Sequence, residues 1–185
     1  MRFNGHSALT GMHAFLSASK HHWVNYDNEK FDRTYFAREA AMRGTRLHDL
    51  ARDLIREGIG LPKTQQTMNL YVNDGIGFRM HPEIILFYSN NAFGTADTIS
   101  FRNGTLRISD LKTGVTPTSM RQLEIYAAYF CLEYNYRPED ITIELRIYQN
   151  DEVKLYSPEP MDIQIIMDKV VALDKRIQSL REDDM

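Results

Sequence analysis

Residues 94–112 read GTADTISFRNGTLRISDLK, two strand-like runs on either side of the dipeptide Asn103-Gly104. Asn-Gly between such runs is the strongest short-range signal for a β-hairpin with a two-residue turn. With this turn, each cross-strand pair lies one residue further out on both strands than the pair before it. The sequence therefore predicts that Asp97 and Asp110 stand opposite each other.

This expected pair of carboxylates is electrostatically costly. Counting outward from the turn makes it a non-hydrogen-bonded pair, whose Cα atoms approach to about 4.5 Å in a regular sheet. Like charges in direct opposition destabilise a sheet. Lys112 lies two residues beyond Asp110 and therefore on the same face. A divalent cation bound to the carboxylates would offset the cost of holding them together.

Alternation along the two strands gives each face of the hairpin a different character. The face that holds Asp97, Asp110 and Lys112 also carries large apolar residues, namely Phe93, Ile99, Phe101, Leu106 and Ile108. The other face carries polar residues, namely Thr98, Ser100, Arg102, Thr105, Arg107 and Ser109. We expect the first face to cover the core and the second to be the more solvated.

Length and composition limit the class of protein. With 185 residues, 43% of them hydrophobic, the chain suits one domain over residues 1–185. It has no apolar run near the roughly 20 residues that span a bilayer, and no signal-peptide pattern, so we expect a cytoplasmic protein without a membrane partner. The single cysteine, Cys131, excludes an internal disulfide and any multi-cysteine metal site held by this chain alone.

Charge is distributed unevenly along the chain. Residues 1–81 hold 11 Lys and Arg against 8 Asp and Glu, and they include all six histidines, whereas residues 82–185 hold 11 against 17. A phosphate-facing surface would therefore draw mainly on the N-terminal half. The alternative is an uneven surface charge without functional meaning.

The pattern of residues 35–57 predicts a helix that ends at Gly58, a common position for glycine after a helix. One stripe of this helix is made mostly of small residues, namely Ala37, Ala41, Gly44, His48, Ala51 and Ile55. Such a stripe lets a helix lie close against a sheet. His48 projects from this stripe, and it is either a site residue or a core histidine.

Patterns in the rest of the chain predict further elements. We expect a short helix near 17–23 within a mixed N-terminal segment, 1–34, that packs on the core, and a loop over 58–80 with a short helix near 64–72. The remaining elements are strands 83–88, 94–102 and 105–112, a helix over 118–134, a second hairpin of 141–149 and 153–156 across Asn150-Asp151, and a C-terminal helix within 160–182.

This order of elements, with Asp97 before a tight hairpin and Asp-X-Lys at its far end, resembles the PD-(D/E)XK nuclease superfamily. It most resembles the RecB-like exonuclease branch, which includes CRISPR-associated RecB-like nucleases and is related to lambda exonuclease. The matching motifs cover most of residues 36–130 and are Gly44-Thr45-Arg46-Leu47-His48, Gly94-Thr95-Ala96-Asp97, Ile108-Ser109-Asp110-Leu111-Lys112-Thr113-Gly114, and Gln122 with Tyr126. The resemblance implies an α/β fold, a central mixed β-sheet flanked by helices (restriction-endonuclease-like core, αβββαβ).

The resemblance also implies a metal site. It assigns metal binding to His48, Asp97 and Asp110, with the backbone carbonyl of Leu111 as a further ligand. Carboxylate and carbonyl oxygens suit Mg²⁺, and an imidazole ligand makes Mn²⁺ competitive. The alternative is that Asp97, Asp110 and Lys112 form a salt-bridged strand end near a turn, against which their shared apolar face and the flanking motifs argue.

Three further residues receive catalytic roles from the resemblance. Lys112 is expected to position or activate the attacking water, and Gln122 and Tyr126 to order the site and the nucleic acid. The last two lie four residues apart on one helix face, where they could also be ordinary amphipathic positions.

The sequence departs from the family pattern in two ways. Ala96 stands where many members have proline, and the four cysteines that hold an iron-sulfur cluster in many RecB-like relatives are missing. We therefore expect no iron-sulfur cluster and the stand-alone type often encoded by phages, which would act in the host cytoplasm. The chain has no helicase motif, so unwinding would need a partner.

The expected activity is that of an Mg²⁺- or Mn²⁺-dependent deoxyribonuclease, an exonuclease that hydrolyses DNA in recombination, repair or phage DNA metabolism. One alternative is a structure- or sequence-specific endonuclease of the same fold. The other is a catalytically inactive DNA-binding or scaffold subunit. Expected partners are DNA ends and a recombinase, single-strand-binding protein or helicase, with the oligomeric state left open.

Overall fold

The computed structural model describes residues 7–9, 11 and 14–183. It divides the chain into two compact units, 1–43 and 44–185, which are described separately. Among the described helices, none combines the length and apolar character that a membrane span requires.

The first unit contains two short 3-10 helices, η1 (Ser7–Leu9) and η2 (Ala18–Asn25), and the start of helix α1 (Asn28–Glu57). This helix begins seven residues before the predicted start at Tyr35, because the Asp27 carboxylate accepts a hydrogen bond of 2.8 Å from the backbone N–H of Lys30 and caps it. That 1–34 packs on the core stays a prediction.

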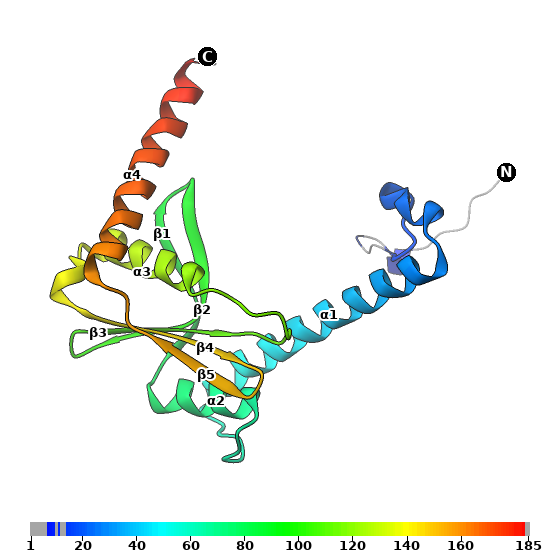
Figure 1. The fold of residues 1–185 in the computed structure, drawn as a ribbon, viewed down its shortest axis with the longest axis horizontal. Helices are drawn as coiled ribbons and strands as arrows, with labels where there is room; N and C mark the ends of the chain where they lie inside the picture. The colour runs from blue at the N-terminus through cyan, green and yellow to red at the C-terminus, as the bar shows by residue number, and fades with distance from the viewer. Residues whose placement is uncertain (1–6, 10, 12–13, 184–185) are drawn as a thin grey trace. The chain divides into compact units, whose positions relative to one another are not determined.

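The second unit is an α/β structure with a five-stranded mixed sheet flanked by helices, which confirms the predicted α/β class (Figure 1). The restriction-endonuclease-like core stays a prediction. After the end of α1 it contains α2 (Thr67–Gly77), β1 (His81–Ser89), β2 (Ala92–Arg102), β3 (Thr105–Leu111), α3 (Arg121–Tyr134), η3 (Pro138–Asp140), β4 (Thr142–Gln149), β5 (Glu152–Tyr156) and α4 (Pro160–Asp183). The strands are arranged in chain order. Only β3 and β4 are parallel, and the other neighbours are antiparallel.

Both predicted hairpins are confirmed. Strands β2 and β3 pair from Arg102↔Thr105 to Thr98↔Ser109, in the register that the Asn103-Gly104 turn requires. The φ angles of the two turn residues, 50° and 73°, lie in the left-handed region. Strands β4 and β5 are likewise joined by Asn150-Asp151, whose φ angles are 53° and 58°. Positive φ at both central residues is the mark of a type I′ turn.

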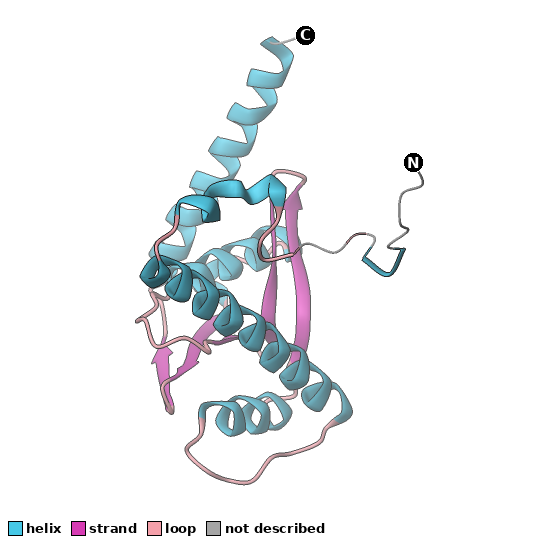
Figure 2. Cartoon of the chain, turned by 90° about the vertical axis from the view of Figure 1, so that its right-hand side faces the viewer, coloured by secondary structure: helices cyan, strands magenta, loops and turns pink. Residues whose placement is uncertain are grey.

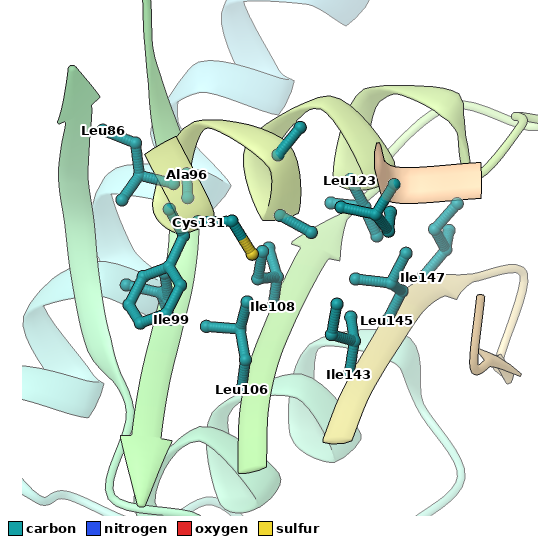
Figure 3. Close-up of a cluster of buried hydrophobic side chains, with 14 residues drawn as sticks. Leu86, Ala96, Ile99, Leu106, Ile108, Leu123, Cys131, Ile143, Leu145 and Ile147 are labelled. Atoms are coloured by element: carbon teal, nitrogen blue, oxygen red, sulfur yellow. The ribbon is translucent and has the colours of Figure 1, made fainter. Parts of the chain in front are cut away.

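One face of the sheet packs on α3 and the start of α4 (Figure 3). The residues of this core include Leu106, Ile108, Leu145 and Ile147 from the strands and Leu123 from α3, all of which are almost completely buried. Cys131, also on α3, is buried here. This face therefore fixes α3, and with it the side chains that α3 presents at the sheet end.

The other face is also covered over part of its length, and there the expectation that it is the more solvated face is wrong. Thr98, Ser100 and Ser109 are almost fully buried. The hydroxyl of Ser109 contacts the sulfur of Met80 at 3.6 Å, and that of Thr98 donates a long bond of 3.4 Å to the Ser109 carbonyl. The hydroxyls of Thr98 and Ser109 thus find local partners under a second helical layer. The buried hydroxyl of Ser100 makes no hydrogen bond to a described residue.

That second layer is formed by α2 and the end of α1. Its core cluster consists of Ala51, Ile55, Tyr71, Val72, Leu111 and Tyr148. Helix α2 occupies part of the predicted loop 58–80 and extends five residues beyond the predicted end at 72. The Asp151 carboxylate caps it, because this group accepts hydrogen bonds from both the N–H, at 2.8 Å, and the hydroxyl, at 3.0 Å, of Thr67.

The alternation of β2 shifts by one residue near Asp97. Strands β1 and β2 run side by side (Figure 2), with Pro82 opposite Thr98 and then Ile84 opposite Ala96. Between these pairs stands Glu83, whose φ of 54° breaks the regular pleat. Ala96 consequently belongs to the α3-side core, whereas Phe93, predicted on the same face as Ile99, is 57% exposed. The predicted placement of Phe93 on the core face is wrong.

Candidate active site

The predicted site residues all lie in the second unit and form two groups. The first, which we call the lysine side, consists of Asp110, Lys112, Gln122 and Tyr126. The second, the histidine side, begins with His48 and Asp97. The lysine side joins the end of β3 to α3, and the histidine side joins α1 to β2.

The centre of the lysine side is an ion pair between Asp110 and Lys112. The Lys112 ammonium donates a hydrogen bond of 3.0 Å to Oδ1 of Asp110. It lies 2.9 Å from Oδ2 as well, but that oxygen is buried and accepts no hydrogen bond, so this second contact is purely electrostatic. Asp110 is only 3% exposed, so its charge depends heavily on this one partner.

Burial changes the acidity of Asp110. Loss of hydration and, to a smaller extent, the nearby charge of Asp97 together raise the pKa of its carboxyl to about 6, against the opposing effects of Lys112 and His48. The predicted proximity of the two carboxylates therefore has a real electrostatic effect. The paired ladder itself, however, ends one step earlier, at Thr98↔Ser109.

The lysine side continues through α3. Lys112 also donates to Oε1 of Gln122 at 3.4 Å, and Nε2 of Gln122 donates to the Tyr126 hydroxyl at 3.1 Å. An ammonium can only donate, so the amide oxygen of Gln122 must face Lys112 and the amide N–H must face Tyr126. This order leaves the phenolic proton of Tyr126 to be donated to another group.

Gly94 on β2 makes room for Tyr126. A Cβ atom at Gly94 would lie 2.9 Å from Cε1 of the Tyr126 ring, closer than real Cβ contacts allow. The absent side chain therefore lets the ring lie directly against the strand. This explains why a glycine stands three residues before Asp97 without invoking a turn.

On the histidine side, Asp97 has two partners of its own. Its Oδ2 accepts a hydrogen bond of 3.1 Å from the backbone N–H of Leu111 and lies 3.4 Å from Nδ1 of His48. The side chains of His48 and Asp97 are 35% and 26% exposed. Asp97 is therefore better solvated than Asp110, and the contact to Nδ1 leaves Nε2 of His48 as the nitrogen that could bind a ligand.

The histidine side includes residues that sequence reasoning did not assign. A cavity of about 20 Å³ is lined by His48, Asp97, Arg52, Tyr71 and Glu83. Burial and the charge of Asp97 raise the pKa of Tyr71, which therefore remains a neutral phenol. Tyr71 was missed although it lies within the short helix expected near 64–72, because no motif links this helix to His48 or Asp97.

Arg52 is held by a group of carboxylates. Its guanidinium makes contacts of 2.8 Å to Asp49 and Asp53 and of 3.5 Å to Glu83, and Arg56 lies 4.0 Å from Glu83. Arg52 is therefore an ion-paired side chain whose charge is already balanced by carboxylates of α1 and β1. The sequence feature that could have placed Arg52 beside the site is its position four residues after His48, on the same face of α1.

The donor atoms suit a divalent cation, although they do not surround one point. Among the described residues, no three His, Cys, Asp or Glu side chains form a group that could hold a metal ion. The carboxylates of Asp97 and Asp110 and the imidazole of His48 are suitable ligands for Mg²⁺ or Mn²⁺. Oδ2 of Asp110 is the buried acceptor that a cation would satisfy. Binding would require the partly exposed His48 and Asp97 to move towards it.

A second cavity, of about 220 Å³, adjoins the ammonium end of the site. Its lining includes Lys112, Thr113 and Gly114 after β3, and Thr67 and Asn150 on the far side. Gly44 packs closely on this segment, since a Cβ atom there would lie 2.7 Å from the hydroxyl of Thr113. The space next to Lys112 therefore combines polar groups with the apolar side chains of Leu47, Met68 and Leu111.

Comparisons with known proteins identify no family. A scan against protein-family models found no matching family, and searches of curated proteins and of solved structures found no match. A function for this chain therefore has to be argued from the geometry of the site and from the motifs that form it.

Proposed function

We propose that the chain is a nuclease that hydrolyses DNA phosphodiester bonds with the help of a divalent cation. One observation carries the proposal: a buried carboxylate, Asp110, with a pKa raised to about 6, is paired with a lysine at the end of a strand. Groups with strongly shifted pKa values are concentrated at functional sites. Asp97 and His48 affect the charge of Asp110, and the three side chains would share a cation after a rearrangement.

Each residue of the lysine side has a role in this proposal. Asp110 and Asp97 would hold Mg²⁺ or Mn²⁺ together with Nε2 of His48 and the carbonyl of Leu111. A bound divalent cation supplies Lewis-acid stabilisation for the charge that develops on a scissile phosphate. Lys112 would hold the attacking water and give charge compensation on the phosphate side.

Gln122 and Tyr126 are positioning residues. Gln122 fixes the direction of the Lys112 ammonium, because its amide oxygen accepts from Nζ at 3.4 Å. Tyr126 accepts from Gln122 and has its own proton left to donate to a phosphate oxygen of the nucleic acid. Both side chains are expected to improve the geometry of the reaction without taking part in bond breaking.

Within this proposal we favour an exonuclease that acts at DNA ends in recombination, repair or phage DNA metabolism. The support is the resemblance of the motifs around His48, Asp97 and Asp110 to RecB-like enzymes that process ends. A structure- or sequence-specific endonuclease would use the same site. A recombinase, single-strand-binding protein or helicase would then supply the DNA end.

One observation favours a second candidate, a DNA-binding or scaffold subunit without activity. Lys112 already neutralises Asp110, and no three-ligand group is preformed in the described part of the chain. In a nuclease, Asp110 would have to bind a cation in addition to Lys112, so this ion pair would have to rearrange. A scaffold subunit can keep the ion pair as it is.

A digestion time course separates these candidates. The protein is incubated with end-labelled linear duplex, single-stranded DNA and covalently closed circular DNA, each with Mg²⁺, Mn²⁺ or chelator. An exonuclease releases labelled nucleotides from linear DNA only, and only with metal. Cleavage of the closed circle indicates the endonuclease. Absence of cleavage under every condition would overturn the nuclease proposal and leave the scaffold.

A further inference from the structure

The first unit contains a cavity of about 370 Å³ that the proposed site does not use. This volume is within the range of roughly 300–1,000 Å³ common for pockets that bind small ligands. The cavity is lined by three aromatic side chains, two cations and a hydroxyl, namely Phe15, Trp23, Tyr26, Lys20, Arg38 and Thr34. Its lining among the described residues includes no carboxylate.

The aromatic rings of this cavity are held in place. The indole N–H of Trp23 donates a hydrogen bond of 2.9 Å to the Ser17 carbonyl, which fixes the plane of the ring. Phe15 packs edge-on against Phe31 and Tyr35, with ring centroids 5.5 and 5.6 Å apart. Rings fixed in this way lose little entropy when a flat ligand stacks on them.

Positive charge lies beside the rings. The Arg38 guanidinium stands 5.3 Å from the centroid of Phe15, and the Lys30 ammonium stands 4.6 Å from that of Tyr26. Lys20 lines the cavity directly and is exposed. A ligand with a flat aromatic part and an attached anion would match both features. An unpaired nucleotide has this chemistry.

We propose that this cavity binds an unpaired nucleotide of single-stranded DNA. The base stacks on the aromatic side chains, and Lys20 and Arg38 bind the adjoining phosphates. The inference rests on the proposed function for its choice of DNA, and it extends that function by assigning a single-strand binding site to the first unit. The excess of basic residues over 1–81 is consistent with this assignment.

Trp23 is the only tryptophan of the chain, so its fluorescence reports on this cavity alone. The full-length Asp110→Ala variant, in chelator, is titrated with an oligothymidylate. Saturable quenching is expected. An abasic deoxyribose-phosphate oligomer of the same length should bind at least about fivefold more weakly, since stacking of one base contributes about 1–3 kcal/mol. A blunt duplex, whose bases are already stacked, should quench weakly.

Charge variants supply the second arm of the test. Lys20→Ala should weaken oligothymidylate binding and lower the slope of log affinity against log salt by about 0.7, the change for one phosphate contact on single strands. Lys169→Ala, which removes an exposed lysine of α4, should change neither quantity. Thermal unfolding of both variants shows whether they remain folded.

The outcomes divide cleanly. Absence of quenching, equal binding of the abasic oligomer, or equal behaviour of Lys20→Ala and Lys169→Ala would overturn the nucleotide site. Because this titration needs neither metal nor catalysis, such a failure leaves DNA cleavage by the wild-type protein intact. Conversely, quenching by oligothymidylate in a protein that cleaves no DNA would overturn the proposed nuclease and keep the cavity assignment.

Discussion

The lysine side and the histidine side of the candidate site use opposite means to hold a carboxylate. Asp110 is 3% exposed and depends on a single ammonium, and its pKa is raised to about 6. Asp97 is partly solvated and accepts a backbone hydrogen bond while it contacts His48. The lysine side therefore carries the electrostatic cost of the site, and the histidine side holds its charge with little penalty.

This difference indicates where a ligand would act. A cation or a phosphate that reaches Lys112 and Asp110 alters an unfavourable arrangement and can gain the most from doing so. The same ligand gains less at Asp97, whose charge already has partners. Function is expected to depend more steeply on the lysine side, which mutations can test.

The largest expected effect is that of Asp110→Ala. If Asp110 is the central ligand, its loss should lower metal-dependent DNA cleavage by about 10³-fold or more. The fold should survive, because the substitution removes a buried charge and leaves Lys112, which is 29% exposed, able to turn to solvent. The measurement is a cleavage time course alongside circular dichroism.

Two controls sharpen that result. Asp168→Ala removes an exposed carboxylate of α4 and should leave cleavage unchanged. His48→Ala should cost less than Asp110→Ala, since His48 lies on the histidine side. Undiminished cleavage by Asp110→Ala would contradict the assignment of this residue.

A second prediction concerns stability and pH in the presence of chelator. The folded pKa of Asp110 is about 6 and lies above the ordinary value of 3.8. Between these two values the folded chain retains a proton that the unfolded chain has lost, so the free energy of unfolding falls as pH rises and levels off above about 6. The free energy of unfolding falls by at most about 3 kcal/mol in total, because the folded and unfolded pKa values differ by roughly two units.

Asp110→Asn isolates this contribution. The variant keeps an oxygen that can accept from Lys112 but has no charge to bury, so it should be more stable than the wild type above pH 6 and similar near pH 4. Urea unfolding at several pH values gives the difference. Mg²⁺ added to a hundred times its dissociation constant should stabilise the wild type by about 2.7 kcal/mol and the variant by less. If the free energies of unfolding of the wild type and of Asp110→Asn change with pH in parallel, the raised pKa assigned to Asp110 is wrong.

The two sides also differ in how far the sequence could predict them. The Asn103-Gly104 turn is a local signal, so the dipeptide alone was enough to predict the register of β2 and β3 from Arg102↔Thr105 to Thr98↔Ser109. The predicted pair of Asp97 and Asp110 lies one step beyond the end of this ladder. The spacing of Asp110 and Lys112 followed from alternation, and that of Gln122 and Tyr126 from helix periodicity.

Contacts between distant segments could not be predicted in this way. Helix α2 is capped by Asp151, which lies 84 residues from Thr67, so no local pattern marked its start. Burial of Thr98 and Ser109 depends on that helix, and the polar side chains alone indicated a solvated face. The shift beside Asp97 arises from the positive φ of Glu83 on the neighbouring strand, which no motif indicated.

The third prediction compares Lys112→Ala with His48→Ala. If Lys112 holds water and phosphate, its removal should lower turnover by about 10²-fold while Mn²⁺ still binds. His48→Ala should instead weaken Mn²⁺ binding by about tenfold and lose less turnover at saturating metal. Calorimetric titration of Mn²⁺, with turnover measured in parallel, separates the two quantities. Loss of metal affinity in Lys112→Ala would mean that the lysine acts on the metal site itself.

The smallest expected effect tests the far end of the lysine side. Gly94→Ala would bring a Cβ atom to 2.9 Å from the Tyr126 ring and displace its hydroxyl from Gln122. Turnover should fall by about tenfold, as expected for one hydrogen bond, while metal binding is unchanged. Gly77→Ala on α2 is the matched control, because a Cβ atom there meets nothing within 4 Å.

A double mutant shows whether Gly94 acts through Tyr126. Tyr126→Phe removes the hydroxyl directly and should reduce turnover to a similar extent. If Gly94→Ala only displaces that hydroxyl, the two substitutions together should cost no more than either alone, because both break the same contact. Additive losses would instead show that Gly94→Ala acts by a route other than the Tyr126 hydroxyl, and they would contradict the assignment of Gly94 to the lysine side.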